Sequence, residues 1–167
     1  TFSHDAKIEG QEVDAGTYGL FMLPIDIENV RVILSKYAKS WGANAPAESE
    51  TVAIVDVKTH EIPSQDCLSY NFISRSGNDV TVELRWDNVA IPFNISFDVD
   101  EIVIENTRAE LKGPAGFSWR GYMQAANYCL QNDTNLEEAM TWIDQSISMS
   151  SGFSNLQVKA GLLAKQG

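Results

Sequence analysis

The sequence is poor in basic residues, with 12 Lys and Arg against 23 Asp and Glu and a formal net charge of -11. The basic side chains are scattered singly or in pairs. Nucleic acid binding draws most of its affinity from clustered Lys and Arg, and an anionic membrane surface attracts the same residues. The composition therefore argues against both partners, and the acidity is interpreted as a contribution to solubility.

The sequence also lacks a long apolar run, because no stretch approaches the roughly eighteen residues of a transmembrane helix. Residues 1–5 have neither the basic nor the apolar region of a signal peptide. Because the first residue is not Met and the segment already looks strand-like, we expect a processed or truncated product. Cysteine is scarce, and for Cys67 and Cys129 we expect free buried thiols and no disulfide framework.

Motifs for catalysis, metal binding or a cofactor are missing from the sequence. The only histidines, His4 and His60, have no His or Cys neighbour at the close spacing of a zinc site. No Gly-x-Ser-x-Gly pattern marks a nucleophile, although the members of a Ser-His-Asp triad can lie far apart in sequence. Asp98, Asp100 and Glu101 form an acidic cluster without the pattern of a calcium loop. We predict solvated histidines, a solvated acidic turn, and no metal or cofactor.

Apolar residues recur with a period of two from Phe2 to about Asp98, which indicates β-strands. The cleanest alternation runs from Val80 to Trp86. Turn signals at 14–17, 76–79 and 87–88 separate such runs, and Gly and Pro indicate a loop at 40–46. About six strands without intervening helices predict an antiparallel β-sandwich or partial barrel.

The segment 100–112 carries mixed signals. Its β-branched residues at 102–104 favour a strand, whereas Arg108 to Lys112 favour a helix, so we predict a strand followed by a helix or loop. Beyond the Gly and Pro residues at 113–116 the apolar period becomes 3.6, which predicts about three short helices. Thr134 and Glu137 have the spacing of a capping box at the start of one of them.

The helical end resembles tetratricopeptide packing, with tight turns, small Ala residues at contacts and about one and a half repeats. So few repeats cannot bury their own apolar stripes, such as the one formed by Leu136, Met140, Ile143 and Ile147. The sequence therefore predicts an α+β chain, with an antiparallel β domain at 1–112 and a helical extension at 113–167 that packs on it.

Several motifs resemble those of a known family. They are Ala15 to Pro24, Val32 to Lys36 with Trp41-Gly42, Val82 to Trp86 with Val89 to Phe93, and the helical pattern from Ala126 to Ala160. The family consists of exported bacterial proteins of uncharacterised function, catalogued as a domain of unknown function and frequent in the Bacteroidetes group. The resemblance implies a periplasmic or secreted location. It also implies a further segment before Thr1 with a Trp-Arg-x-Gly-Ala-Asn type motif, which this chain lacks, and it supplies no catalytic residues.

Lys36, Trp41, Glu83 and Arg85 form the candidate ligand site. Lys36 and Trp41 flank a Gly-containing loop, and Glu83 and Arg85 share the strand face opposite an apolar stripe. A Trp beside cationic side chains is a platform for a sugar or a carboxylate. The alternative, which we prefer from sequence, is a Trp that caps the core and a cross-strand ion pair.

Two functions follow from these observations. The first is a non-catalytic binding or interaction module, with a protein or a small ligand such as a sugar or carboxylate as its partner. The second is a hydrolase that acts on sugar or peptide material through an unrecognised site. A deep pocket lined by the four candidate residues, or by His4 with carboxylates, would favour the hydrolase. Filled cavities would favour a third possibility, a purely structural scaffold.

Overall fold

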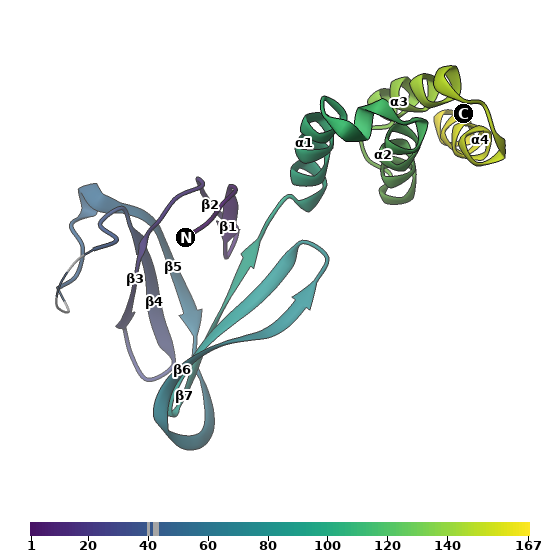
Figure 1. Ribbon diagram of the computed structural model, residues 1–167. Coiled ribbons are helices and arrows are strands. Elements are labelled where there is room, and N and C mark those ends of the chain that lie inside the picture. Colours follow the sequence, from purple (N-terminus) through teal and green to yellow (C-terminus); the bar gives the residue numbers. More distant parts are fainter. Residues whose placement is uncertain (40, 42–43) are drawn as a thin grey trace. The chain divides into compact units, whose positions relative to one another are not determined.

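The computed structural model describes residues 1–39, 41 and 44–167 and divides into two compact units, Thr1–Asp98 and Val99–Gly167 (Figure 1). The first unit is built of strands and the second of helices, which confirms the predicted α+β class. The predicted loop at 40–46 falls in part on Ser40, Gly42 and Ala43, which lie outside the described residues.

The β unit contains two antiparallel sheets with the strand orders β2-β1-β7-β6 and β3-β4-β5. Among the described strands no pairing closes the two sheets into a barrel, so the architecture is the two-sheet form of the prediction. The strands are β1 (Ala6–Ile8), β2 (Gln11–Val13), β3 (Gly19–Pro24), β4 (Asn29–Ser35), β5 (Thr51–Lys58), β6 (His60–Ser76) and β7 (Asp79–Ser96).

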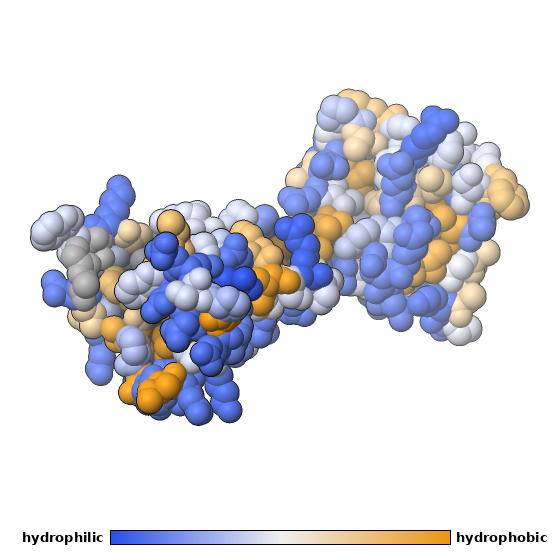
Figure 2. All heavy atoms as spheres, turned by 90° about the horizontal axis from the view of Figure 1, so that it is seen from below, coloured by the Kyte–Doolittle hydropathy of each residue, from blue (hydrophilic) through white to orange (hydrophobic). Residues whose placement is uncertain are grey.

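The core of the β unit follows from the alternation of apolar residues. Val30, Val32 and Leu34 of β4 are buried, as are Val82 of β7 and Ile8 of β1. Because neighbouring residues of a strand point to opposite faces, this pattern brings one face of each sheet onto a shared apolar cluster. Figure 2 shows polar residues in blue over much of the surface, with apolar residues in orange exposed in both units.

Strand β7 folds back on itself. If it ran straight, its 18 residues would span about 60 Å. Instead, the amide N of Phe97 donates to the carbonyl O of Asn78 at 2.9 Å, so the two ends of β7 lie side by side. Asp87 has a left-handed φ of 51°, which is compatible with the tight turn predicted at 87–88. β6 pairs with this bent strand from Asp79 to Ala90, and the pairing is interrupted by three register shifts.

The helical unit begins earlier than expected. Helix α1 spans Val99–Leu111, so the prediction of a strand at the start of 100–112 was wrong. Ile104 is buried in the helical core, and the hydroxyl of Tyr128 donates to Asp100 at 2.7 Å. These tertiary contacts outweigh the strand preference of the β-branched residues, which is a weak effect for each residue.

Three further helices complete the unit: α2 (Trp119–Asn132), α3 (Leu136–Met149) and α4 (Phe153–Gln166). Ala126, Cys129, Ile143 and Leu162 are fully buried in their shared core. Gly161 permits a close approach, because a Cβ there would lie 2.7 Å from the Leu130 side chain. The stripe of α3 is therefore buried at least in part among the helices.

The predicted capping box at the start of α3 was wrong. The N-cap is Asn135, one residue later than Thr134, and its φ of 47° is left-handed. The Asn135 side chain donates instead to the carboxylate of Glu138 at 2.6 Å, because the backbone turn directs it toward the first helical turn. Two statements about the helices remain predictions: that they are of tetratricopeptide type, and that they pack on the β unit.

Candidate functional site

Glu83 is a charged residue buried in the β unit. It lies in the first arm of β7, where Val82 and Leu84 point to one face of the strand and Glu83 and Arg85 to the other. Across the ribbon, Asn71 of β6 pairs with Glu83, and Ser69 pairs with Arg85. Because directly paired residues share a face, these four side chains gather on one side of the ribbon.

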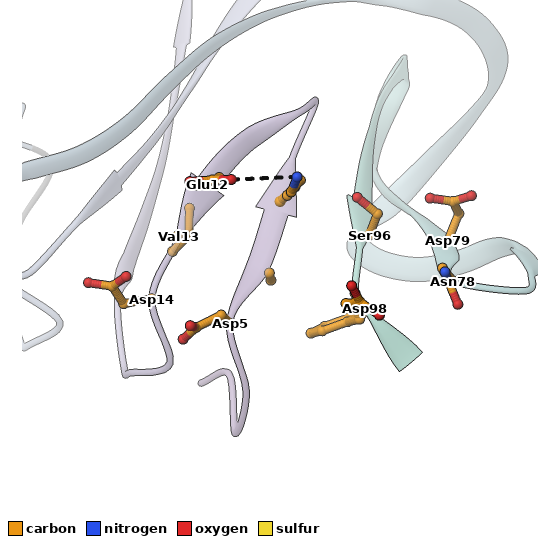
Figure 3. A pocket seen from close by; sticks show the side chains of 11 residues that line it. Asp5, Glu12, Val13, Asp14, Asn78, Asp79, Ser96 and Asp98 are labelled. Carbon is orange, nitrogen blue, oxygen red and sulfur yellow. Dashed lines mark ion pairs between the residues drawn. The ribbon is translucent and has the colours of Figure 1, made fainter. Parts of the chain in front are cut away.

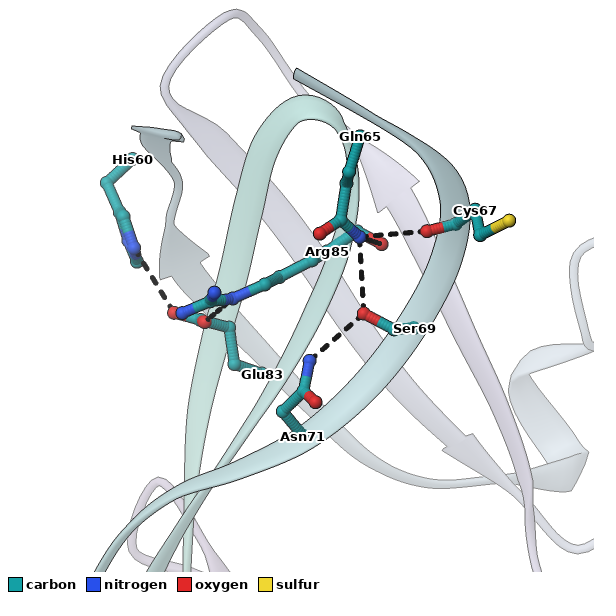
Figure 4. Close-up of polar contacts among 7 residues, drawn as sticks. All are labelled: His60, Gln65, Cys67, Ser69, Asn71, Glu83 and Arg85. Atoms are coloured by element: carbon teal, nitrogen blue, oxygen red, sulfur yellow. Dashed lines mark hydrogen bonds and ion pairs between the residues drawn. The ribbon is translucent and has the colours of Figure 1, made fainter. Parts of the chain in front are cut away.

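The carboxylate of Glu83 is only half satisfied. Its side chain is 1% exposed, and its Oε1 accepts a hydrogen bond from Arg85 Nε at 2.5 Å. His60 Nε2 lies 3.1 Å from Oε2, but the imidazole is not oriented to donate, so Oε2 accepts no hydrogen bond from any residue that the structure describes. Figure 4 shows His60 and Arg85 reaching the same carboxylate from opposite sides.

Gln65 makes hydrogen bonds to both β6 and β7 in the same region. Its Nε2 lies within 3.2 Å of three acceptors, the carbonyls of Cys67 and Arg85 and the Oγ of Ser69. An amide has two N–H groups, so one of them is shared. These contacts span the register shift of β6 between Gln65 and Ser69 and connect the two strands there. Ser69 Oγ also accepts from Asn71 Nδ2 at 3.0 Å, as Figure 4 shows.

We refer to His60, Ser69, Asn71, Glu83 and Arg85 as the Glu83 cluster. The His60 side chain is 49% exposed and that of Arg85 is 38% exposed, so both connect the buried carboxylate to the surface. Nη1 and Nη2 of Arg85 donate no hydrogen bond within the described part of the chain. The cluster thus combines unused donors with an unused acceptor, which is what a site for a polar ligand requires.

The four residues predicted from sequence are not all joined in the structure. Glu83 and Arg85 form an ion pair within one strand, two residues apart, and the contact of Glu83 that crosses strands is with His60 of β6. Trp41 is 96% exposed and does not cap the core. Lys36 is exposed, and its amide N donates to the carbonyl O of Glu50 at 2.8 Å. That these four residues bind a ligand stays a prediction.

Sequence reasoning missed the contact of His60 with Glu83, although His60 is half exposed at the start of β6 as expected of a strand-end residue. Counting back from the hairpin loop at 76–79 would have placed Tyr70 and Phe72 opposite Arg85 and Glu83, because the count does not include the register shift between Phe72 and Ser74. Ser69 and Asn71 were therefore not predictable in this way, and neither was His60, which lies beyond two further shifts of β6. The prediction of a buried thiol was confirmed for Cys129 and wrong for Cys67, which is exposed beside a register shift.

A second feature of the β unit is an acidic hollow of about 520 Å³ lined by Asp5, Glu12, Asp14, Asp79 and Asp98, with Lys7 beside Glu12 (Figure 3). Asp5 Oδ1 accepts from the amide N of Ala15 at 2.7 Å. Among the described residues, no group of three or more His, Cys, Asp or Glu is arranged to hold a metal ion. None of the four candidate residues lines this hollow.

Comparison with protein families matches residues 1–95 to a family described as "Protein of unknown function (DUF2911)". The chain belongs to this family. The matched segment contains every member of the Glu83 cluster and ends inside β7, so the family relationship rests on the β unit. No curated protein and no solved structure matches the chain. None of the helices in the described ranges is long and apolar enough to cross a membrane.

Proposed function

We propose that the β unit is a non-catalytic binding module that holds a small, uncharged polar ligand at the Glu83 cluster. The observation that carries this proposal is the buried Glu83 carboxylate, whose Oε2 accepts no hydrogen bond from a described residue. Burying a charged group costs several kcal/mol unless it is fully paired. A protein that keeps such a half-satisfied group gives up stability, and groups of this kind concentrate at functional sites.

The charges of the cluster favour a neutral ligand. The negative charge of Glu83 and the positive charge of Arg85 offset each other at 2.5 Å. A free carboxylate would find Arg85 already paired, within a chain whose formal net charge is -11. A ligand with hydroxyl groups can donate to Glu83 and accept from Arg85 Nη1 and Nη2. Between the two small-ligand classes suggested by the sequence, this balance supports a sugar over a carboxylate.

Access to Glu83 depends on His60. The buried Oε2 lies behind an imidazole that is half exposed to solvent. Rotation of His60 into another staggered rotamer would move the imidazole away from Oε2 without moving the backbone. A ligand hydroxyl could then take the position of the imidazole beside the carboxylate, and supply the donor that the cluster lacks.

A hydrolase acting on sugar or peptide material is the alternative, and the pairing of His60 with Glu83 is the observation that favours it. An imidazole beside a buried carboxylate has two of the components of a general base, although His60 donates no hydrogen bond to Glu83 in this structure. This alternative makes a distinct prediction: His60→Ala abolishes turnover of a chromogenic glycoside or ester, whereas a binding module has no turnover to lose.

The resemblance of the strand motifs to exported bacterial proteins supports a periplasmic or secreted location for this binding activity. A ligand screen with neutral sugars, carboxylates and amines compares an uncharged class with an anionic and a cationic one. The screen measures the melting temperature of the chain, which rises when a ligand binds the folded state alone.

The decisive variants are Glu83→Gln and its matched control Glu61→Gln, which makes the same change at an exposed position of β6. We expect a neutral sugar to raise the melting temperature of the wild type and of Glu61→Gln by several degrees at millimolar concentration, and to leave Glu83→Gln unchanged. Side-chain amide resonances of Asn71 should shift with the same sugar. An equal response of Glu83→Gln, or no response of the wild type to any class, would sink the proposal.

A further inference from the structure

The face of the β6–β7 ribbon opposite the Glu83 cluster carries a group of exposed apolar side chains. Leu68 and Tyr70 are each 53% exposed, Phe72 is 74% exposed, and Trp86 on β7 is 60% exposed. Leu68, Tyr70 and Phe72 alternate with Ser69 and Asn71, so they share a face by the period of the strand. We call these four residues the aromatic patch.

The register explains why the patch is continuous across the two strands. Tyr70 pairs with Leu84, and Phe72 pairs with Val82. Val82 is buried in the core and Leu84 is 9% exposed, so Tyr70 and Phe72 lie beside covered side chains on the same face of the ribbon. Trp86 is two residues beyond Leu84 and therefore on the same face.

The area of the patch is similar to that of the largest apolar patch on a typical monomer, which is often a functional surface. A fully exposed aromatic side chain presents about 150–250 Å², so three of them at these exposures and one Leu present roughly 450 Å². Contiguous apolar patches of a few hundred Å² mark sites of interaction. Two such patches packed against each other, with their flanking residues, would bury about 1,000 Å², which is where stable protein interfaces begin.

The chemistry of the patch fits a second copy of the same chain. Its four side chains are uncharged, and the nearby charges of Glu83 and Arg85 lie on the opposite face of the ribbon. A two-fold contact must be self-complementary, which an uncharged aromatic surface satisfies and a surface of one sign does not. Tyr, Trp and Phe are also the residues most enriched at protein interfaces.

We propose that two copies of this chain associate through the aromatic patch, with Phe72 and Trp86 of each copy packed across a two-fold axis. The area lies at the low end for specific interfaces, so the dimer is reversible and depends on protein concentration. Each chain carries a formal net charge of -11, so the copies repel each other outside the patch. Added salt screens this repulsion and strengthens the dimer, opposite to its effect on a partner of complementary charge.

Sedimentation velocity from about 5 to about 500 μM protein, at low and high salt, tests the proposal. Phe72→Glu places a charge in the patch, and Ile27→Glu makes the same change at a position that is 95% exposed outside it. We expect Phe72→Glu to raise the concentration of half-dimerisation at least about tenfold, which corresponds to about 1.4 kcal/mol. Ile27→Glu leaves dimerisation unchanged.

A second measurement uses the exposed Cys67 next to the patch. Cys129 is buried, so a spin label attaches selectively to Cys67. The dimer then gives a dipolar signal between labels that grows with concentration and is lost in Phe72→Glu. A wild type that remains monomeric throughout the range overturns the proposal. Equal effects of Phe72→Glu and Ile27→Glu on dimerisation overturn it as well. A loss of stability of the Phe72→Glu monomer also overturns it, because Phe72 would then be packed within a single chain.

Discussion

The β unit and the helical unit both bury polar side chains, but they complete the hydrogen bonds of those side chains differently. In the helical unit Asn155 is fully buried, and its Nδ2 donates to the carbonyl of Ser150 at 2.7 Å and to Ser146 Oγ at 3.3 Å. Its Oδ1 accepts from the amide of Gly152, which closes the turn before α4. In the β unit, Glu83 is buried to nearly the same extent and keeps one oxygen without a donor among the described residues.

This difference separates a structural polar group from a candidate functional one. A satisfied buried network stabilises one arrangement of the chain, whereas a half-satisfied charge costs stability and has a place for another molecule. The family match covers residues 1–95 and ends before the first helix of the second unit. Under the proposal above, binding belongs to the β unit, and we expect the helical unit to behave as a scaffold.

The largest expected effect is a loss of stability on replacing a core residue, and it tests whether the two units unfold separately. Ile143 of α3 and Ile8 of β1 are both fully buried, each in the core of its own unit. Replacement of either by Ala should cost about 2–5 kcal/mol through lost burial and the cavity left behind. Hydrogen exchange should show lost protection only in the unit that carries the change. If either variant lowers protection equally in both units, the comparison between them fails, because the chain unfolds as one.

A smaller effect distinguishes the two kinds of buried polar group. Asn155→Ala leaves the Gly152 amide and the Ser150 carbonyl without their partner, and should cost about 1–3 kcal/mol in urea unfolding. Glu83→Gln removes a buried charge and keeps the shape, and the partly exposed Arg85 can turn to water. We expect its cost to remain below about 1 kcal/mol. Equal costs would mean that Glu83 is structural as well.

The smallest expected effect is on the pH dependence of the stability of the helical unit. The guanidinium of Arg108 donates to Glu138 at 2.8 Å and, with Asn135, lowers the pKa of that carboxyl below its usual value of 4.5. A lowered pKa in the folded state means that the pair stabilises the helical unit above pH 4.5, and that this contribution is lost as the pH falls through the folded-state pKa. A partly exposed pair contributes at most about 1 kcal/mol.

Glu138→Gln should therefore flatten the loss of helical stability between neutral pH and acid, measured by urea unfolding at several pH values. The β unit has its own acid-sensitive pair, because Arg31 lowers the pKa of Asp56 through a hydrogen bond. Asp56→Asn is the matched control, and it should change the pH dependence of the β unit alone. A Glu138→Gln variant with the pH dependence of the wild type would contradict the assignment.

The alternation from Val80 to Trp86 was sufficient to predict the strand and the shared face of Glu83 and Arg85. It did not predict that Glu83 is buried or that Trp86 is 60% exposed. Helices α2 and α3 were predicted from apolar stripes that the structure buries. The first half of α1 was missed because three β-branched residues favour a strand locally, whereas contacts with α2, distant in sequence, decide the outcome. His60 was missed because the register shifts of β6 depend on the bend of β7, which the periodicity of the sequence does not encode.

The fold-back of β7 also bears on the order in which the β unit forms. The two ends of β7 are separated by a bend near Asp87 and can meet as soon as this short segment exists. Strand β1 pairs with the C-terminal end of the same bent strand, Lys7 opposite Ser96, across almost the whole unit. Such a distant contact is slow to form, and on the ribosome β1 must wait until the last strand has been synthesised. The N-terminal strands therefore have no sheet partner in β7 until the second arm emerges, which makes this the interval in which the nascent chain depends most on protection from aggregation.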